Sequence, residues 1–316
     1  MEYRRLGKTE FIVSRICFGA LTVGPLQKNL TFEEGGRVIS EALAGGVNMI
    51  DTAELYGTYG HIKEGIKVVQ RDKVHIMTKS YAYDKKTAEE SLKKALTELG
   101  TDYVDGFLLH EQESEHTLRG HWEAFEYFMK KKEEGYIRSL GISSHCLAAI
   151  KAAVDIEEID VVHPIVNKIG IGINDGNIDQ MLALLKRLKE KDKGIYSMKP
   201  LGGGHLIGSY DEAIDFVMGI EEVDSIAMGM QNLDEVKANL LKFSGKEIPL
   251  EIQKNLKSKN RTLQIADWCT GCGNCVRRCK QKALKIENQK AVVDYEKCVL
   301  CSYCAKVCPD FCIKVI

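Results

Sequence analysis

Eight of the eleven cysteines in this 316-residue chain fall into two runs with the same spacing near its C-terminus. The first run is Cys269, Cys272, Cys275 and Cys279, and the second is Cys298, Cys301, Cys304 and Cys308, followed by Pro309. Each reads C-x2-C-x2-C-x3-C, a spacing typical of bacterial domains with two 4Fe–4S clusters, in which the fourth cysteine of each run ligates the other run's cluster. We therefore expect one cluster on Cys269, Cys272, Cys275 and Cys308, and a second on Cys298, Cys301, Cys304 and Cys279.

Zinc is the alternative occupant of these cysteines, because paired C-x2-C units also bind zinc tetrahedrally. Two runs of four cysteines at identical spacing favour iron–sulfur clusters over zinc. Cys312 follows the second run and is expected to pack rather than to ligate, while Cys17 and Cys146 stand alone in the larger part of the chain. Isolated cysteines of this kind usually behave as small buried hydrophobes.

The composition limits where the protein works and what it binds. Thiolate-held clusters need reducing conditions, so no disulfides are expected. The N-terminal segment is charged rather than apolar, and the chain has no apolar stretch of the length, about 18 residues, that a membrane span needs. The net charge of −1 does not indicate a binding surface for nucleic acid or for a membrane. We therefore expect a soluble, cytoplasmic protein with no nucleic-acid and no membrane partner.

Charge is distributed unevenly along the chain. Residues 265–316 contain nine Lys and Arg against five Asp and Glu, so this segment is basic while the remainder is acidic. These cations either balance the negative charge of the thiolates and clusters, or form a docking face for an acidic redox protein partner.

Ahead of the cysteine runs, short β-branched segments alternate with amphipathic helical patterns. The predicted strands are Ile16–Phe18, Val47–Asp51, Val74–Thr78, Val104–Leu109, Leu140–Ser143, Val161–Val166, Ile195–Lys199 and Ser225–Gly229. Capping boxes predict helix starts at Thr31 with Glu34, Thr87 with Glu90, Ser209 with Glu212 and Asn232 with Glu235. Eight strand–helix alternations in about 250 residues are the signature of an α/β fold, the (β/α)8 TIM barrel. A doubly wound open sheet shows the same alternation, but no G-x-G-x-x-G follows the first strand.

The chain therefore divides into three parts. Residues 1–250 are expected to form the barrel, and the opening segment Tyr3–Val13 resembles a β-hairpin, with Gly7 in its turn, that caps the bottom. Residues 251–264 are expected to form a linker helix. Residues 265–316 are expected to form a small α+β domain that resembles a bacterial two-cluster ferredoxin.

The active site of a TIM barrel lies at the C-terminal ends of its strands. Asp51 and Tyr56 follow the second predicted strand in Asp-Thr-Ala-Glu-Leu-Tyr-Gly, Lys79 ends the third in Thr-Lys, and His110 ends the fourth in Leu-Leu-His. Together with the opening hairpin, these motifs resemble those of the aldo/keto reductase family, in the same order. The resemblance implies that Tyr56, Lys79, Asp51 and His110 are catalytic and that the substrate is a small carbonyl compound.

The four side chains suit the roles that this resemblance implies. A free tyrosine has a pKa of about 10 and is a poor acid, but a neighbouring ammonium lowers that value. Lys79 would supply the charge, Asp51 would hold Lys79 charged, and His110 would hydrogen-bond the substrate carbonyl beside Tyr56. The alternative is a structural ion pair between Asp51 and Lys79, with a core histidine at position 110.

The resemblance also implies a nicotinamide cofactor. Ser143, Ser144 and Asn167 fall where family members place polar residues for the carboxamide. The loop from Lys199 through Leu201 and Gly202 suits close approach of backbone to a pyrophosphate, and Gly229, Gln231, Glu235 and Asn239 match the segment for the adenosine end. A carboxylate at Glu235 would repel a 2′-phosphate, so both NADH and NADPH are candidates.

Nicotinamide delivers two electrons at once, whereas each cluster moves one. The sequence therefore predicts an NAD(P)H-dependent oxidoreductase that reduces an aldehyde or ketone to an alcohol, with two 4Fe–4S clusters for electron exchange or structure. A flavin, which handles both kinds of transfer, is a third candidate cofactor. The alternative function is an iron–sulfur electron-transfer or redox-sensing protein whose barrel binds nicotinamide or flavin without carbonyl turnover.

Overall fold

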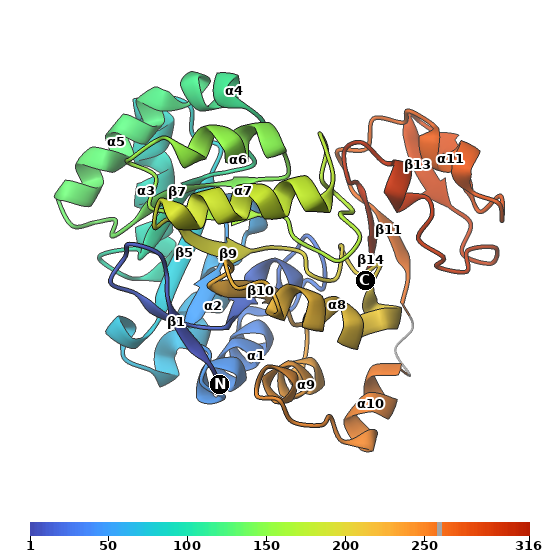
Figure 1. Ribbon diagram of the computed structural model, residues 1–316. Coiled ribbons are helices and arrows are strands. Elements are labelled where there is room, and N and C mark those ends of the chain that lie inside the picture. Colours follow the sequence, from blue (N-terminus) through green and yellow to red (C-terminus); the bar gives the residue numbers. More distant parts are fainter. Residues whose placement is uncertain (258–260) are drawn as a thin grey trace.

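The computed structural model describes residues 1–257 and 261–316, and its largest feature is a closed barrel of eight parallel strands (Figure 1). The barrel strands are β3 (Ile16–Gly19), β4 (Met49–Asp51), β5 (His75–Ser80), β6 (Gly106–Leu109), β7 (Leu140–Ser144), β8 (Val161–Pro164), β9 (Gly194–Ser197) and β10 (Ser225–Gly229). Neighbours in the barrel are consecutive in sequence, and β10 closes the ring by pairing with β3. The predicted TIM barrel is confirmed, and the open sheet is excluded.

Helices surround the barrel and connect its strands. They are α1 (Phe32–Ala44), α2 (Tyr59–Gly65), α3 (Lys85–Leu99), α4 (Glu115–Gly120), α5 (Trp122–Glu133), α6 (Leu147–Val154), α7 (Ile178–Glu190), α8 (Tyr210–Met218) and α9 (Leu233–Phe243). None of the described helices is both long enough and apolar enough to cross a membrane.

Alternation along the strands decides which side chains enter the barrel. Met49 and Leu108 belong to the cluster that fills the barrel, whereas their neighbours Ile50 and Phe107 pack in the larger core beneath the helices. Both faces are covered, so the strands are apolar throughout rather than half polar. In β4, Asp51 lies two residues after Met49, so its side chain points to the same, inner face of the barrel. The carboxylate of Asp51 therefore lies in the barrel mouth.

Helix starts agree with the predicted capping boxes in part. Thr31 caps α1 as predicted, because its hydroxyl accepts from the Glu34 backbone N–H and the Glu34 carboxylate accepts from the Thr31 N–H. The predicted start of α3 at Thr87 is wrong. The carboxylate of Asp84 accepts from the Thr87 N–H at 2.8 Å, so the helix begins at Lys85.

Of the two later predicted helix starts, one has the expected side-chain cap and the other does not. The Asn232 side chain accepts from the Glu235 N–H and caps α9 as predicted. Ser209 precedes α8 but makes no side-chain cap, because a 3-10 turn at Ile207–Ser209 runs directly into the helix.

A β-hairpin closes the bottom of the barrel, as predicted. Its strands β1 (Tyr3–Arg5) and β2 (Ile12–Ser14) pair antiparallel. Gly7 adopts a φ of 51°, in the left-handed region that favours glycine, and the turn thereby brings Leu6 and Phe11 into the base of the barrel.

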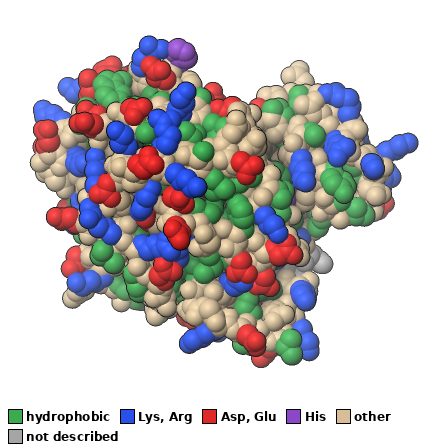
Figure 2. Space-filling model, in the orientation of Figure 1, with side chains coloured by type: hydrophobic (Ala, Val, Ile, Leu, Met, Phe, Trp, Pro, Cys, Tyr) green, Lys and Arg blue, Asp and Glu red, His purple; other side chains and the backbone are tan. Residues whose placement is uncertain are grey.

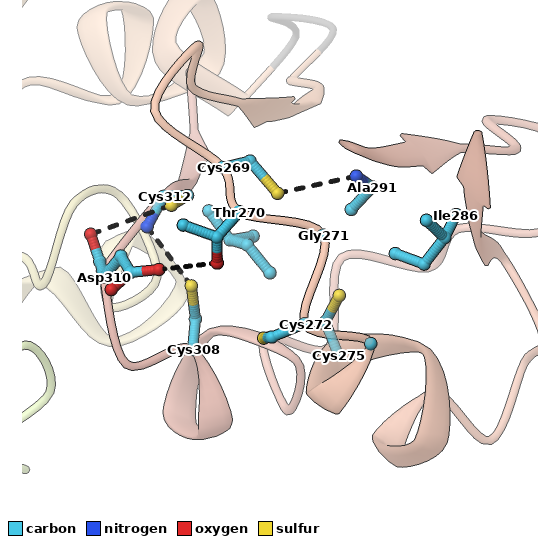
Figure 3. A pocket seen from close by; sticks show the side chains of 12 residues that line it. Cys269, Thr270, Gly271, Cys272, Cys275, Ile286, Ala291, Cys308, Asp310 and Cys312 are labelled. Carbon is cyan, nitrogen blue, oxygen red and sulfur yellow. Dashed lines mark hydrogen bonds between the residues drawn. The ribbon is translucent and has the colours of Figure 1, made fainter. Parts of the chain in front are cut away.

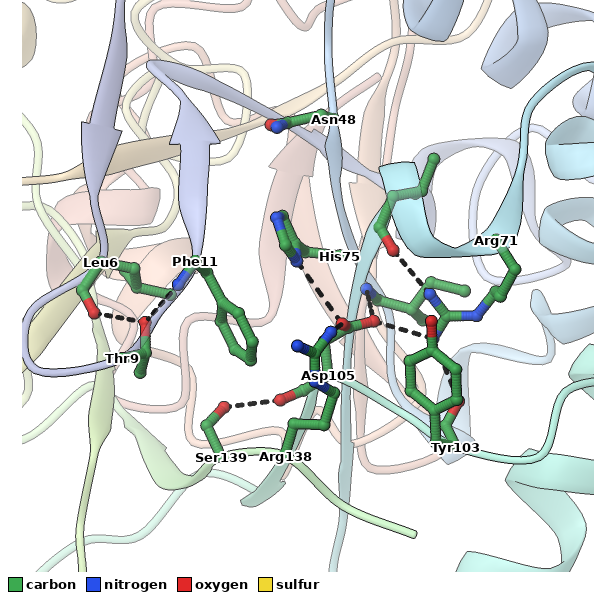
Figure 4. Close-up of polar contacts among 12 residues, drawn as sticks. Leu6, Thr9, Phe11, Asn48, Arg71, His75, Tyr103, Asp105, Arg138 and Ser139 are labelled. Atoms are coloured by element: carbon green, nitrogen blue, oxygen red, sulfur yellow. Dashed lines mark hydrogen bonds and ion pairs between the residues drawn. The ribbon is translucent and has the colours of Figure 1, made fainter. Parts of the chain in front are cut away.

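The buried carboxylate of Asp105 lies beside this hairpin, just before β6 (Figure 4). It accepts from Arg71 Nη2 at 2.7 Å and from Arg138 Nη1 at 3.0 Å, and the Arg138 guanidinium lies 5.0 Å from the centroid of the Phe11 ring. Burial alone would raise the pKa of Asp105, but His75 and Arg71 hold it below its usual range. This network joins the hairpin to the strand entrances on the face opposite the expected active site.

The small C-terminal domain follows α10 (Leu250–Lys257). It contains α11 (Asn274–Arg278) and two antiparallel strand pairs, β11 (Leu263–Ile265) with β14 (Ile313–Val315) and β12 (Leu284–Glu287) with β13 (Lys290–Val293). Basic side chains gather on the face of this domain that is in view in Figure 2.

β14 connects the small domain to the top of the barrel (Figure 1). The Val315 N–H donates to the Gly203 carbonyl at 3.0 Å, and His205 Nε2 lies 2.8 Å from the Ile313 carbonyl oxygen. Gly204 has a φ of 91°, and a Cβ there would lie 1.9 Å from the Val315 oxygen. The glycines after β9 therefore allow the backbones of the two domains to meet.

Candidate active site

The four predicted catalytic residues lie together at the C-terminal ends of neighbouring strands. Asp51 ends β4, Lys79 lies in β5, and His110 follows β6, while Tyr56 ends a 3-10 turn, Glu54–Tyr56, that leaves β4. Lys79 Nζ lies 5.2 Å from the centroid of the Tyr56 ring, and the Tyr56 hydroxyl lies 3.4 Å from His110 Nε2. These contacts join the three strand ends.

Asp51 is the centre of a buried polar network. Lys79 Nζ donates to Asp51 Oδ1 at 2.6 Å and to the Thr52 carbonyl at 2.7 Å. The Tyr196 hydroxyl donates to the same Oδ1 at 3.1 Å, and His163 Nε2 lies 3.7 Å from it. Burial alone would raise the pKa of Asp51, but the Lys79 ammonium, with His163 and Tyr196, holds that pKa below its usual range.

The sequence motifs did not single out Tyr196 or His163. Their rings stack with centroids 3.9 Å apart, at neighbouring positions in β9 and β8. The available signal was a polar side chain inside an otherwise apolar strand, at an inward position. Because both strands are buried on two faces, such residues need a polar partner inside the barrel.

The sequence predicted that Lys79 lowers the pKa of Tyr56, but the net shift of that pKa is upward. Burial raises the pKa of Tyr56 well above its ordinary value, and Asp51 and Glu111 add to the rise. Asp51 offsets much of the charge of Lys79, so the ammonium favours the phenolate too weakly to outweigh burial, and the net shift of the Tyr56 pKa is upward. Tyr56 is therefore protonated at rest, which is the form that donates a proton.

His110 is a neutral hydrogen-bonding group in this site. Burial, together with the charge of Lys79, lowers its pKa to about 3. Its ring stacks on Tyr81 with centroids 4.5 Å apart, and its Nδ1 is buried with no hydrogen-bond partner among the described residues. Nε2, on the other side of the ring, faces the Tyr56 hydroxyl.

One large cavity opens above Tyr56 and Asp51 and extends over the top of the barrel to α9 and the small domain. Six predicted cofactor-binding residues line it, namely Lys199, Leu201, Gly229, Gln231, Glu235 and Asn239. Glu235 accepts from the Gln231 N–H at 2.8 Å, and Asn239 accepts from the Tyr210 hydroxyl at 2.7 Å. The cavity therefore joins Tyr56 to the polar groups of α9 and is the candidate site for a dinucleotide.

The other four predicted cofactor-binding residues, Ser143, Ser144, Asn167 and Gly202, are not among the described residues that line this cavity. The Ser143 hydroxyl accepts from the Glu111 N–H at 2.8 Å, and Ser144 donates to a backbone carbonyl of the same loop at 2.6 Å. The Asn167 side chain exchanges two hydrogen bonds with the backbone of Ile171, at 2.9 and 3.0 Å. In this structure the three polar side chains hold loops at the barrel mouth.

In the small domain, Cys269, Cys272, Cys275 and Cys308 line one small cavity (Figure 3). The Ala291 N–H donates to Cys269 Sγ at 3.5 Å, and the Cys312 N–H donates to Cys308 Sγ at 3.3 Å. Hydrogen bonds to the sulfurs of an iron–sulfur cluster tune its reduction potential. Cys312 also borders this cavity, with its Sγ 3.8 Å from the Asp310 carbonyl oxygen.

A second small cavity is lined by Cys279, Cys298, Cys301 and Cys304. Cys279 and Cys308 each follow a short helical turn in extended conformation, with φ and ψ of −75° and 100° and of −87° and 110°. The fourth cysteine of each run thereby lines the cavity of the other run. Among the described residues, no three His, Cys, Asp or Glu side chains are close enough to hold a single metal ion. Each cavity thus presents four thiols, the number of ligands that a 4Fe–4S cube takes from protein.

Known families account for both parts of the chain. Residues 15–243 match the model of the aldo/keto reductase family. The chain belongs to this family. In addition, residues 262–309 match the model of a 4Fe-4S dicluster domain, so this aldo/keto reductase has an iron–sulfur domain after its barrel.

Relatives agree with this assignment at low identity. An aldo-keto reductase of Mycobacterium avium is 32% identical over 184 residues, covering 56% of this chain and 60% of the relative. The L-galactose dehydrogenase of Arabidopsis thaliana is 29% identical over 219 residues, covering 65% of this chain and 67% of that protein. The match thus spans less than two thirds of the Mycobacterium relative.

Solved structures show the same fold. A putative aldo-keto reductase from Pseudomonas aeruginosa superposes with a TM-score of 0.66 at 20% identity, covering 77% of this chain and 95% of that one. The holo form of an aldo-keto reductase from Bacillus halodurans gives a TM-score of 0.64 at 22% identity, covering 81% and 95%. At these identities the likeness concerns the fold alone.

Proposed function

We propose that this aldo/keto reductase is an NAD(P)H-dependent oxidoreductase that reduces an aldehyde or ketone to an alcohol. The observation that supports it most is the protonated Tyr56 hydroxyl on the cavity wall, 3.4 Å from neutral His110 and backed by the Lys79–Asp51 pair. Bound nicotinamide supplies the hydride in this chemistry.

The protein's own groups would handle the carbonyl oxygen. Tyr56 would donate its proton to that oxygen as negative charge develops there, and His110 Nε2 would orient it. Once the proton has left, the Lys79 ammonium, 5.2 Å from the Tyr56 ring, would stabilise the resulting phenolate. Asp51 would keep Lys79 charged and in place.

The cavity wall bears on the choice of nicotinamide. Glu235, in the first turn of α9, lines this cavity, and its carboxylate would repel a 2′-phosphate and accept a hydrogen bond from a ribose 2′-hydroxyl. We therefore propose that NADH is preferred over NADPH. Glu235→Gln removes the repulsion and should lower the KM for NADPH more than that for NADH.

In the small domain, we propose that the two sets of four cysteines hold two 4Fe–4S clusters. The clusters would supply one-electron transfer, and the basic surface of the domain suits an acidic redox partner (Figure 2). Acid extraction of anaerobically purified protein followed by an absorbance spectrum tests for the third candidate cofactor, because an extracted flavin absorbs in the visible range.

Anaerobic turnover of a carbonyl panel with NADH and NADPH tests the proposed reaction. Tyr56→Phe should lower kcat by about 100-fold to 10,000-fold, the range for losing a general acid. Tyr83→Phe is the matched control, because Tyr83 is 57% exposed and should leave kcat unchanged. Full activity in Tyr56→Phe would show that the assigned proton donor is wrong.

Electron transfer without carbonyl turnover is the second candidate function. It is favoured by Cys298, an expected cluster ligand that lines the same cavity as Tyr56. Persistent nicotinamide binding and reversible cluster reduction by a redox partner, with no alcohol formed from any carbonyl in the panel, would support this function instead.

A further inference from the structure

Two amines from different domains lie beside the cavity that Tyr56 lines. Lys199 follows β9 of the barrel, Lys314 lies in β14 of the small domain, and both border this cavity. Their Nζ atoms lie 4.9 and 3.1 Å from the centroid of the Phe311 ring. The small domain thus places a cation at the barrel mouth, next to a cation of the barrel itself.

The position of Lys314 is fixed by the docking of the small domain. Phe311 packs so closely on the barrel that a Cβ at Gly172 or Gly203 would lie 3.0 Å from its ring. Lys314 Nζ donates to the Phe311 carbonyl, and Val315, the next residue, is hydrogen-bonded to the backbone of Gly203. Lys314 is therefore part of a built junction and not a mobile surface lysine.

The charges at this junction do not balance. Lys199 Nζ lies 2.6 Å from His145 Nε2, but burial, together with the charge of Lys199, lowers the pKa of His145 well below its usual range, so that histidine is a neutral acceptor. The nearest carboxylate, Glu111, lies 3.9 Å from His145 Nε2 and already accepts from the Tyr81 hydroxyl at 2.5 Å. Two amines thus share one carboxylate, and Lys314 also faces the sulfurs of Cys308 and Cys312.

Neither amine has an ion-pair partner within 4.0 Å among the described carboxylates, in contrast to Lys79, whose charge Asp51 compensates. Burial and the charge of Lys199 lower the pKa of Lys314 well below its usual range, although Cys308 and Glu111 act in the opposite direction. Burial and the charge of Lys79 lower the pKa of Lys199 to about 8. Paired like charges without a counter-ion are costly inside a protein, and a bound anion removes that cost.

We propose that Lys199 and Lys314 form an anion-binding subsite across the two domains, which holds a carboxylate or phosphate group of the carbonyl substrate reduced at Tyr56. This inference rests on the proposed carbonyl reduction and specifies its substrate class. It also gives the iron–sulfur domain a part in substrate recognition, because one of the two cations comes from β14.

Matched substrates that differ in charge test the subsite under anaerobic conditions. Butanal is compared with 4-oxobutanoate, which adds a carboxylate, and glyceraldehyde with glyceraldehyde 3-phosphate, which adds a phosphate. The wild type should show a kcat/KM about tenfold to hundredfold higher for one or both anions, since hydrogen bonds to charged groups contribute that much. The pair with the larger ratio identifies the anion. Equal values within both pairs, with all four carbonyls reduced, would overturn the subsite and leave the proposed function standing. Reduction of none of the four would count against the proposed function.

Variants of the two lysines test whether the preference for anionic substrates depends on them. Lys314→Met should raise the KM for the preferred anion by about tenfold or more, with little change in the KM for its neutral partner. Lys199 is also a predicted cofactor-binding residue, so Lys199→Met is judged by the ratio of the two KM values, which should rise by the same factor. Lys314→Arg should retain the preference. The control, Lys285→Met, removes an exposed cation of the same domain and should change nothing.

A binding measurement keeps the test independent of turnover. Isothermal titration of 4-hydroxybutanoate into protein loaded with NADH cannot lead to reaction, because both compounds are already reduced. Its Kd should rise about tenfold in each Met variant, whether or not any carbonyl is turned over. If Lys314→Met instead shifts the midpoint potential of a cluster and leaves this Kd unchanged, the subsite is refuted. Lys314 then compensates the negative charge of the cluster that Cys308 is expected to ligate.

Discussion

The Nζ atom of Lys79 lies 2.6 Å from Oδ1 of Asp51, and both side chains are almost completely removed from solvent. This pair carries no net charge, which explains why burial dominates the pKa of Tyr56 and keeps its hydroxyl protonated. In the proposed function, the barrel presents a proton donor beside a neutral histidine, with a cation behind it that would act once the proton has moved. That arrangement suits reduction of a carbonyl better than stabilisation of a resting phenolate.

Tyr196→Phe should impair the site through Asp51. The hydroxyl of Tyr196 is one of the groups that hold the pKa of Asp51 down, so its loss should raise that pKa and move the acidic limb of the kcat/KM profile to higher pH. We also expect kcat to fall by about tenfold, which corresponds to one hydrogen bond to a charged group. Tyr59→Phe is the control, since Tyr59 is equally buried but bonds the hydroxyl of Thr78 at 2.7 Å. An unmoved acidic limb in Tyr196→Phe would contradict this role.

Asp105→Asn should destabilise the barrel without a direct effect on chemistry. The substitution leaves the guanidiniums of Arg71 and Arg138 without their buried counter-ion, and we expect a loss of about 3 kcal/mol in the free energy of unfolding. The folded-state pKa of Asp105 is depressed, so its contribution is present above the unfolded pKa and is lost as pH falls through the folded value. Urea unfolding at several pH values measures both effects. In the control, Asp192→Asn, an exposed pair with Arg5 is lost, and the change should stay within about 0.5 kcal/mol.

Cluster content follows from the way the cysteines are grouped. The wild type should contain about eight iron and eight sulfide per chain, as two 4Fe–4S clusters require. Cys301→Ser should reduce the iron content toward about four, because Cys301 lines only the second cavity. Cys312→Ser should keep the full iron content. Zinc in place of iron, or loss of iron in Cys312→Ser, would show that the ligands are wrongly assigned.

The spacing of residues along the sequence predicted the fold and most of the candidate site. The strand–helix alternation predicted the closed barrel, and motifs at strand ends predicted that Asp51, Lys79 and His110 would lie close together, because parallel strands bring their C-terminal ends to one face. The cysteine spacing likewise predicted that Cys308 joins the first three cysteines of the first run. In the structure these four cysteines line one cavity, and the other four line the second.

Contacts between segments distant in sequence escaped prediction. The direction of the Tyr56 pKa depends on burial and on the closeness of Asp51 to Lys79, which no motif encodes. The glycines after β9 were expected to approach a pyrophosphate, whereas in the structure Gly204 meets the backbone of Val315. Likewise, Lys314 reaches the barrel mouth only because the small domain docks there.

The junction of the two domains predicts a pH dependence for anionic substrates. Lys199 loses its charge as pH rises through its pKa of about 8, a value lowered by burial and by Lys79 and raised by Glu111. Lys314 also faces this site, and its pKa is lowered well below the ordinary lysine value. The kcat/KM for the preferred anionic carbonyl should therefore decline above a pH of about 8, while that of its neutral partner declines less. Parallel profiles for the charged and neutral members of the pair would contradict the prediction.

The fate of the hydride tests the central claim most directly. Butanal is incubated anaerobically with NADH that carries deuterium at the transferred position, and the butanol is examined by mass spectrometry. Direct reduction at Tyr56 predicts one deuterium on the carbinol carbon of the wild-type product and almost no product from Tyr56→Phe. Butanol that carries hydrogen from solvent at that carbon, or equal amounts of deuterated butanol from both proteins, would contradict the account.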